Sequence, residues 1–276
     1  MRRQLTSRAW PLLARHKRWI CVLVCAAAYC SFACLKTAKP ASTEVRAENT
    51  QLARSDELIE ATRKDDLTQI QKLLNAGADP NSADAKGYTP LMIAALRGAD
   101  KVVQTLLDAH ANVNALDKDG STALSMAIQR RHSTTVGILL NEGADVTFKY
   151  ADKRTALHYA IEIRDNIVVA MLLDRSADVN ARNDHGETPL LLSLRRDPAI
   201  VDALIARGAD VNAADVDGWT PLMEAAGGNN LRVVKILLDH GADAKARDKD
   251  GWTAHKQALL SGCDGIIAQI AYAAAL

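Results

Sequence analysis

From about residue 54 onward, apolar positions recur in short blocks with the spacing of α-helices. The segment 84–116 shows the pattern most clearly. Thr89-Pro90 opens a first helix, because proline is favoured in the first turn, where its missing N–H has no helical partner. A break at 97–99 precedes a second helix with apolar residues at helical spacing. The expected buried residues are Leu91, Ala94 and Ala95 in the first helix and Val102, Val103, Leu106 and Leu107 in the second.

This predicted helix pair is one unit of a repeat. The motif Gly-Tyr-Thr-Pro-Leu of residues 87–91 returns in altered forms, and its threonine stands at positions 89, 122, 155, 188, 220 and 253. The spacing is 33 residues, broken once by 32. A second motif, of the form Ala-Asp-Val-Asn, follows each second helix on the same period. Neither helix of a unit can bury both of its faces alone, so the pattern predicts that neighbouring units stack.

The two motifs and their period resemble the ankyrin repeat. The resemblance covers about residues 54–272 and implies an all-α solenoid of stacked helix-turn-helix units joined by β-turn loops. The first and last units are expected to be atypical caps, since the first lacks the Gly-Thr-Pro opening and the last has His255 in place of leucine. The predicted repeats are 54–83, 84–116, 117–149, 150–182, 183–214, 215–247 and 248–272.

Three residues stand where the repeat has glycine. His110 and Ser176 replace the glycine that ends a second helix, and Lys153 replaces the glycine of a turn. A left-handed backbone conformation at a residue with a Cβ costs about 1 kcal/mol. Asp197-Pro198 stands where the fifth unit is one residue short. The middle of the stack is therefore expected to be its less regular part.

Ahead of the repeats, residues 19–35 run for 17 positions without a charge, after a basic segment at 1–18. Seventeen residues make a helix of about 25 Å, barely long enough for a bilayer core. The basic flank would stay in the cytoplasm, so we expect the repeats to face outward. Residues 36–53 are polar and predict a flexible linker. The six basic residues, with no acid among residues 1–35, are Arg2, Arg3, Arg8, Arg15, Lys17 and Arg18.

Three fates of the segment 19–35 are open: an uncleaved membrane anchor, a cleaved signal peptide, or a lipoprotein signal. Ser31-Phe32-Ala33 before Cys34 resembles the lipobox of bacterial lipoproteins, except that Ser31 stands where an aliphatic residue is preferred. Cys34 is therefore the candidate for lipidation. All three fates place the repeat domain on the inner membrane or in the periplasm of a bacterium. The structural alternative, a buried core helix, fits the basic flank poorly.

Charge separates the two parts of the chain. The formal net charge is +1 for the full sequence, but beyond residue 35 there are 28 basic and 33 acidic side chains, a net of −5. A mildly acidic domain argues against a general nucleic-acid binder. Four of the five cysteines lie in the first 34 residues and Cys263 stands alone, so we predict neither an intradomain disulfide nor a zinc site.

The repeats contain none of the common catalytic or cofactor motifs: no HExxH, no GxSxG, no Walker lysine loop and no GxGxxG. His158, in Thr-Ala-Leu-His, matches the Thr-Pro-Leu-His of the ankyrin family. Its predicted role is a hydrogen bond to the adjacent turn rather than catalysis. The recurrent Asp and Asn residues are expected to accept backbone N–H groups in turns. We therefore expect no enzymatic activity, no cofactor and no bound metal.

The resemblance implies that a partner docks on the concave side, formed by the turn tips and the exposed edge of each first helix. Arginines there would form a basic track along the central groove, and two tryptophans would occupy adjacent turn tips. Trp, Tyr and Arg dominate interface hot spots. Alternatively, the tryptophans pack on neighbouring turns and the arginines form a solvated face. The predicted partner-binding residues are Tyr88, Arg97, Arg130, Arg154, Arg195, Arg196, Trp219 and Trp252.

The predicted function is a monomeric protein-interaction module that binds a partner protein with an acidic surface. A stabilising factor, or an immunity-like inhibitor of an envelope enzyme or toxin, is the alternative. A third interpretation is a subunit of an enzyme whose activity lies entirely in the partner. The expected partners are another protein and, through residues 19–35, a membrane, but not nucleic acid.

Overall fold

The computed structural model describes residues 41–275, which are helical and contain no β-strand. Contacts divide the chain between Leu52 and Ala53. The described part of the first unit is the beginning of helix α2 (Ala41–Lys64), and the second unit holds the repeats. None of the described helices is both long and apolar enough to cross a membrane. The segment 19–35 and the predicted lipidation site Cys34 lie outside the described residues.

Residues 41–53 differ from the prediction, because they are part of α2 instead of a flexible linker. Pro40 directly precedes the helix, and neither proline nor glycine occurs between Ala41 and Ala53. This stretch also contains three alanines together with Glu, Arg, Gln and Leu, which have high helix propensities. Its polarity, which suggested a linker, is equally compatible with a solvated helix.

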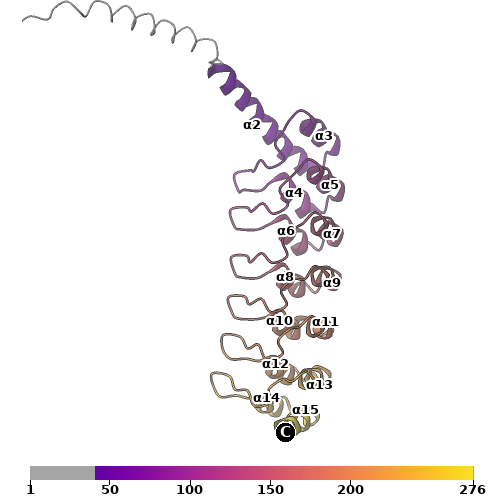
Figure 1. Cartoon of the computed structure of the whole chain (residues 1–276), viewed down its shortest axis with the longest axis vertical. Coiled ribbons are helices and arrows are strands. Elements are labelled where there is room, and N and C mark those ends of the chain that lie inside the picture. The colour runs from indigo at the N-terminus through magenta and orange to yellow at the C-terminus, as the bar shows by residue number, and fades with distance from the viewer. Residues whose placement is uncertain (1–40, 276) are drawn as a thin grey trace, which may run out of the picture. The chain divides into compact units, whose positions relative to one another are not determined.

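Seven helix pairs follow one another in the described residues (Figure 1). The first helices are α2, α4 (Pro90–Arg97), α6 (Ala123–Gln129), α8 (Ala156–Glu162), α10 (Pro189–Arg196), α12 (Pro221–Gly227) and α14 (Ala254–Ser261). The second helices are α3 (Leu67–Asn75), α5 (Asp100–Asp108), α7 (Ser133–Asn141), α9 (Asn166–Asp174), α11 (Val201–Ala206), α13 (Leu231–Asp239) and α15 (Asp264–Ala275), with the short 3-10 helix η1 (Pro198–Ile200) before α11. The predicted all-α solenoid is confirmed.

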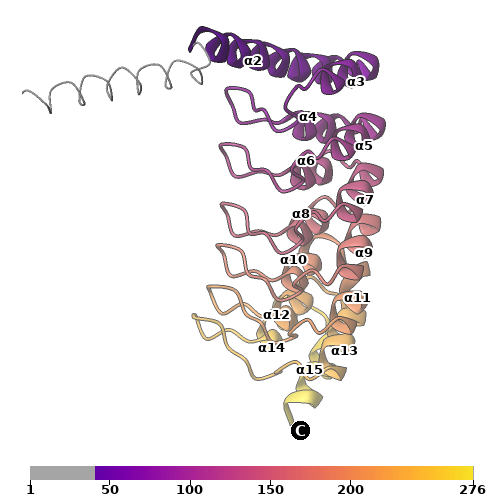
Figure 2. The same ribbon diagram turned by 45° about the horizontal axis from the view of Figure 1, so that its top comes forward.

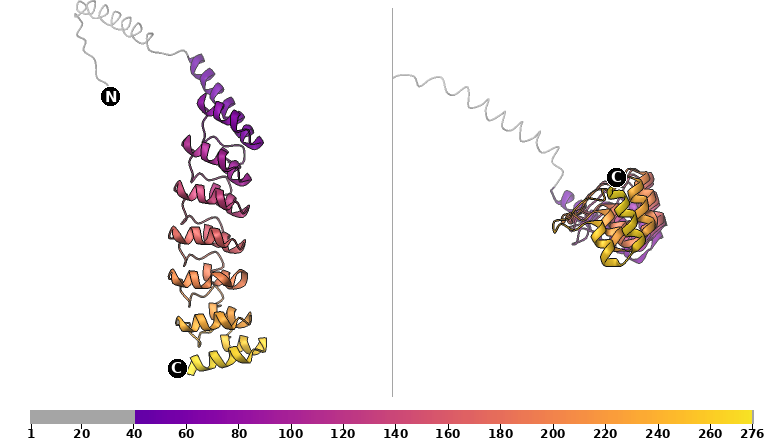
Figure 3. Two further views of the ribbon diagram at one scale, coloured as in Figure 1. Left: turned by 90° about the vertical axis from the view of Figure 1, so that its right-hand side faces the viewer. Right: turned by 90° about the horizontal axis from the view of Figure 1, so that it is seen from below.

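Within residues 53–275 the pairs stack in two columns. From α4 onward each first helix contacts the first helix of the next pair, and second helices such as α5, α7 and α9 contact one another in the same way. The loops between pairs project as fingers from one side of the stack (Figure 2). Seen from the side, the pairs in the middle of the stack lie one on another with their helices in nearly the same orientation (Figure 3).

Leucines and small residues hold the stack together. The motif leucines of the first helices are at most 1% exposed, and fully buried alanines beside them allow neighbouring helices to approach closely. In the last pair His255 takes the place of the leucine, and its buried Nδ1 has no hydrogen-bond partner among the described residues. The motif leucines are Leu91, Leu124, Leu157, Leu190 and Leu222.

The recurring threonines cap the first helices. The Thr89 side chain, for example, accepts a hydrogen bond from the backbone N–H of Met92 at 3.3 Å, and Thr188 and Thr220 do the same one turn into their helices. Such caps satisfy backbone donors that a helix leaves unpaired at its start. The Gly-X-Thr-Pro-Leu motif therefore encodes a turn, a cap and the first buried residue in succession.

Except at Tyr150, each described finger is closed by an Asp or Asn. Asp117 accepts backbone N–H groups from Asp119 at 2.9 Å and Ser121 at 2.7 Å, in the manner of an Asx-turn. Asn residues then link the repeats: Asn180 donates to the Gly208 carbonyl at 3.0 Å and accepts from the Asp210 N–H at 2.8 Å. Equivalent links are made by Asn81, Asn114 and Asn212.

The junction between the third and fourth repeats is built differently. Thr147 stands where the linking Asn is expected and bonds to Asp145 of its own repeat at 2.7 Å. Tyr150 replaces the finger Asp, and its hydroxyl lies 3.0 Å from the Thr122 hydroxyl of the preceding repeat. Its ring makes edge contacts with Phe148 at 5.1 Å and Tyr159 at 5.2 Å. Aromatic packing here takes the place of backbone links.

The residues that replace glycine keep the glycine conformation. The φ angles of His110, Ser176 and Lys153 are 63°, 58° and 57°. Each therefore carries the left-handed strain of about 1 kcal/mol that the sequence predicts. At Lys153 an ion pair with Asp184, 3.0 Å away on the next finger, offsets part of it.

Candidate functional site

The fingers and the first helices together form one face, which we call the inner face. Three positions of each repeat contribute to it: the residue before the capping Thr, the fourth residue after it, and the end of the first helix. Side chains from these positions contact one another, as Arg154 and Glu162 do in one repeat and Arg195 and Glu224 in two neighbouring repeats. The predicted partner-binding residues all belong to these positions.

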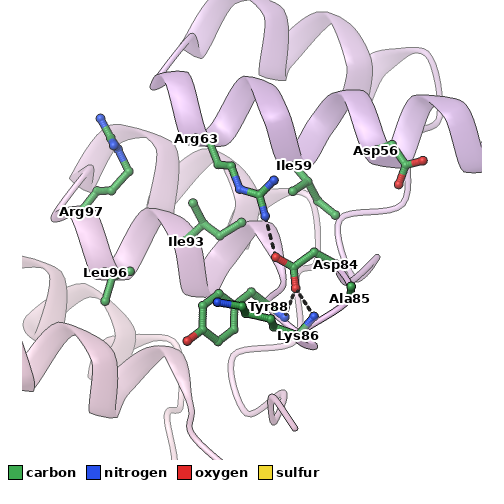
Figure 4. Close-up of a pocket in the computed structure, with 10 residues that line it drawn as sticks. All are labelled: Asp56, Ile59, Arg63, Asp84, Ala85, Lys86, Tyr88, Ile93, Leu96 and Arg97. Atoms are coloured by element: carbon green, nitrogen blue, oxygen red, sulfur yellow. Dashed lines mark hydrogen bonds and ion pairs between the residues drawn. The ribbon is translucent and has the colours of Figure 1, made fainter. Parts of the chain in front are cut away.

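At its N-terminal end the inner face has a hollow of about 890 Å³ (Figure 4). Ile59 of α2 and Ile93 of α4 are buried there, with only 3% and 6% of their surfaces exposed. Tyr88 is partly buried, and Arg97 is exposed at the end of α4. The structure thus brings two of the predicted residues, Tyr88 and Arg97, to one hollow. Its other lining residues are Asp56, Arg63, Asp84, Ala85, Lys86 and Leu96.

One ion pair crosses the hollow. The Arg63 guanidinium lies 2.6 Å from a carboxylate oxygen of Asp84, and the other oxygen accepts the N–H groups of Lys86 at 2.8 Å and Tyr88 at 3.0 Å. Burial acts to raise the pKa of the Asp84 carboxyl, but these bonds and the charge of Arg63 outweigh it and lower the pKa. The Asp84 carboxylate is therefore ionised, and both of its oxygens are bound by groups of the protein itself.

Three exposed cations of this end have no such partner. Lys86, Arg97 and, one repeat further on, Arg130 are exposed, and their side chains make no hydrogen bond or ion pair within residues 41–275. Figure 4 shows the Arg97 side chain extending away from the Arg63–Asp84 pair. The charge of these side chains is available to a bound molecule.

The centre of the inner face differs from the predicted basic track. Arg154 is paired with Glu162 and with Asp152 at 3.4 Å, and its guanidinium lies 5.9 Å from the centre of the Tyr159 ring. Burial and the negative charge of Asp152 raise the pKa of Tyr159 to about 12, so its hydroxyl stays protonated at neutral pH. The charge of Arg154 is therefore paired with carboxylates of its own repeat.

Arg195 is surrounded by three carboxylates, which lie on two successive fingers and on helix α12. It is paired with Glu187, with Glu224 at 2.8 Å and with Asp215 at 3.7 Å. Burial acts to lower the pKa of Arg195, but the hydrogen bond to Glu224 and the three negative charges raise it. Together with the Arg154 cluster, two arginines face five carboxylates, a formal net charge of −3. The described centre of the inner face is acidic, not basic.

The tryptophans lie toward the C-terminal end and are partly buried. Trp219 packs against the core, and its indole N–H donates to Glu224 at 2.8 Å. Trp252 is covered by the Lys256 ammonium, 3.9 Å from the ring centre. Both rings thus have contacts inside the stack. Arg196 is the last residue of α10, and its side chain lies outside the described side chains.

Asp215 and Glu224 were not identified from the sequence as residues of this face. Glu224 is the fourth residue after Thr220, the position that Ile93 and Tyr159 occupy in their repeats, so alignment of the repeats places it on the inner face. Asp215 is a finger Asp that closes its own turn with one oxygen and leaves the other for Arg195. Only the three-dimensional stacking brings them to an arginine of the preceding repeat.

Comparison with known families is decisive for the fold. The sequence model described as ankyrin repeats (3 copies) matches residues 58–150, 147–215 and 195–274. The chain belongs to the ankyrin-repeat family. Ankyrin repeats are generally non-enzymatic scaffolds that bind other proteins.

Among solved structures, the chain is similar to the ankyrin repeat domain of Bcl-3, described as a unique member of the IkappaB protein family. The TM-score is 0.69 at 29% sequence identity, over 78% of this chain and 97% of that domain. No protein in the curated collection of sequences matches. Within the described residues, no group of three or more His, Cys, Asp or Glu side chains is placed to hold a metal ion.

In this ankyrin-repeat chain His158 has the role predicted from its motif. Its Nδ1 accepts the Thr155 N–H at 3.2 Å, so the proton lies on Nε2, which donates to the Glu187 carbonyl of the next finger at 3.2 Å. The predicted hydrogen bond to the adjacent turn is confirmed. Burial, with a smaller effect of the Arg154 charge, lowers the pKa of the imidazole below its ordinary value.

The pKa of His158 makes stability depend on pH. Since the pKa is lower in the folded state, the unfolded chain binds the proton first as the pH falls, and the stabilisation present above about pH 6.5 then declines. His158→Met, which copies Met92 and Met223 of other repeats, is expected to lower the free energy of unfolding by about 1–2 kcal/mol at pH 8. The difference from the wild type should shrink between pH 7 and 5.

Urea unfolding across this pH range, followed by circular dichroism, measures the effect. His185→Gln is the control, because His185 is exposed on a finger tip and its replacement should leave the free energy of unfolding at pH 8 nearly unchanged. If the difference in the free energy of unfolding between the wild type and His158→Met stays constant from pH 8 to 5, His158 is not the source of the pH dependence.

Proposed function

We propose that this ankyrin-repeat protein binds a partner protein through its inner face, while it is attached to a bacterial inner membrane or exported across it by residues 19–35. The observation that carries the binding proposal is the set of exposed cations at the N-terminal end of this face. Within the described residues, the side chains of Lys86, Arg97 and Arg130 make no hydrogen bond or ion pair, whereas Arg154 and Arg195 on the same face are paired with carboxylates. Exposed side chains without a structural role favour recognition.

The proposed binding face is tested by photo-crosslinking of the full chain in membranes. A photoreactive amino acid at Gln129, exposed at the end of α6 on the inner face, is expected to give a discrete adduct with one partner protein. The matched position is Lys101, exposed on the outer helix α5, where no such adduct should form. Equal adducts at both positions, or no adduct at Gln129, would show that the partner does not bind specifically on the inner face.

The membrane part of the proposal rests on the sequence: an uncharged run at 19–35 behind six basic residues. Alkaline phosphatase fused after Leu276 should then be active only with residues 1–35 in place, because the enzyme requires export. If a reporter that works only in the cytoplasm is active at the same position, the repeats face the cytoplasm and the proposed orientation is wrong. The identity of the crosslinked protein separates a scaffold from the alternative, an inhibitor of an envelope enzyme or toxin.

A further inference from the structure

We infer that the hollow at the N-terminal end of the inner face takes a partner segment in which a carboxylate side chain stands next to a large apolar side chain. This inference rests on the proposed function and narrows it to the first two repeats, 54–83 and 84–116. It replaces the predicted central track with a site in which apolar and basic side chains are combined.

The apolar half of the site is the floor of the hollow. Ile59 and Ile93 come from different repeats, are both buried and both line the hollow, while Leu96 and Tyr88 are partly exposed at the sides. A hollow of about 890 Å³ lies in the size range of pockets that enclose small organic ligands. It therefore has room for one or two large side chains of a docked segment.

The basic half is the rim. The lining residues carry three positive charges, on Arg63, Lys86 and Arg97, and two negative charges, on Asp56 and Asp84, a formal sum of +1. Arg63 and Asp84 neutralise each other, so Lys86 and Arg97 outnumber Asp56 among the remaining charges. In the next repeat the inner-face positions hold Ser121, Met126, Gln129 and Arg130 and no acid, which extends the positive region.

The charge pattern along the face selects the occupant. The basic segment 1–18 of this chain carries the wrong sign for the rim. A polyanion such as nucleic acid would continue into the described centre, where the clusters around Arg154 and Arg195 have a net charge of −3. A partner segment with its acid confined to one end meets the cations at the hollow and avoids that repulsion.

The test selects binders for the full chain, kept in mild detergent, from a random dodecapeptide display library. The expected binders contain Asp or Glu within two positions of Leu, Ile, Phe or Trp. Measured by fluorescence anisotropy, they should bind Arg97→Glu at least ~10-fold more weakly than the wild type and bind Lys101→Glu within about 2-fold of it. Leu96→Ala should weaken them as well, and added salt should lower their affinity.

Thermal unfolding checks that the variants stay folded, which we expect because Arg97 and Lys101 are exposed. Binders that lack the acid-and-apolar pair, or that tolerate Arg97→Glu but lose affinity on Trp252→Ala, overturn this inference and leave the inner face as the binding surface. Binders that are sensitive only to Lys101→Glu or Arg232→Glu on the outer helices overturn the proposed function as well. A library that yields no binder counts against both.

Discussion

Gly87→Ala is expected to lower the free energy of unfolding by about 2–3 kcal/mol, and Gly120→Ala by only about 1 kcal/mol. The two glycines hold the same position on consecutive fingers, with φ angles of 86° and 76°. Both variants therefore carry the strain of a left-handed residue with a Cβ. The difference between them isolates the contact between neighbouring fingers.

At Gly87 the next finger is close. An added Cβ would lie 2.9 Å from the backbone nitrogen of Lys118, whose N–H donates to the Lys86 carbonyl at 3.2 Å. At Gly120 nothing lies within 4 Å. The finger that follows Gly120 begins with Tyr150, which packs on the preceding repeat and makes no backbone link to that finger among the described bonds.

The chain itself shows how such a Cβ is accommodated. Lys153 carries one at this position with φ of 57°, and the backbone bond to the next finger, from the Asp184 N–H to the Asp152 carbonyl, persists at 3.1 Å. In Gly87→Ala the finger must move to reach a similar conformation. Because such a movement relieves the close contact, the expected loss in the free energy of unfolding stays in the lower part of the range for overpacked sites. Thermal or urea unfolding of the two variants measures the difference, and equal losses would show that finger contacts do not contribute.

The repeat period and the caps could be predicted from the sequence because they depend on residues close together in the chain. Wherever Thr-Pro-Leu occurs in the repeats, Thr-Pro begins a helix and the leucine after it is buried. The linker prediction was wrong beyond Ala41, since polar composition does not distinguish a solvated helix from an extended chain.

The charge of the inner face could not be predicted in the same way. Repeat alignment finds Arg154 and Arg195 at exposed positions, but an arginine's effective charge depends on which carboxylates its long side chain reaches. Asp215 and Glu224 form ion pairs with Arg195 but belong to the next repeat in the sequence. They come close to Arg195 only because the two repeats stack. By contrast, Tyr88 and Arg97 share a repeat, so their proximity followed from local structure.

Arg195→Met is expected to lower the free energy of unfolding by about 2 kcal/mol, or the melting temperature by roughly 4–8 °C. Without the guanidinium, Glu187, Asp215 and Glu224 remain together as three like charges. The Arg195 side chain is 36% exposed, so the loss should fall between that of a buried pair, about 3–5 kcal/mol, and that of a surface pair, below about 1 kcal/mol. Arg232→Met is the matched control, because the pair of Arg232 with Asp202 is largely exposed, and it should cost little.

Two further measurements separate this charge effect from lost packing. Adding Glu224→Gln to Arg195→Met should recover part of the loss, because the amide removes one like charge and its oxygen can still accept the Trp219 indole N–H. The deficit should also narrow at high salt concentration, because salt screens the repulsion between the carboxylates. If Arg195→Met is as stable as the wild type and instead weakens partner binding, Arg195 is a recognition residue. If stability falls as expected, reduced binding by variants at Arg195 reports a damaged stack, and Arg97 is the cleaner probe of the inner face.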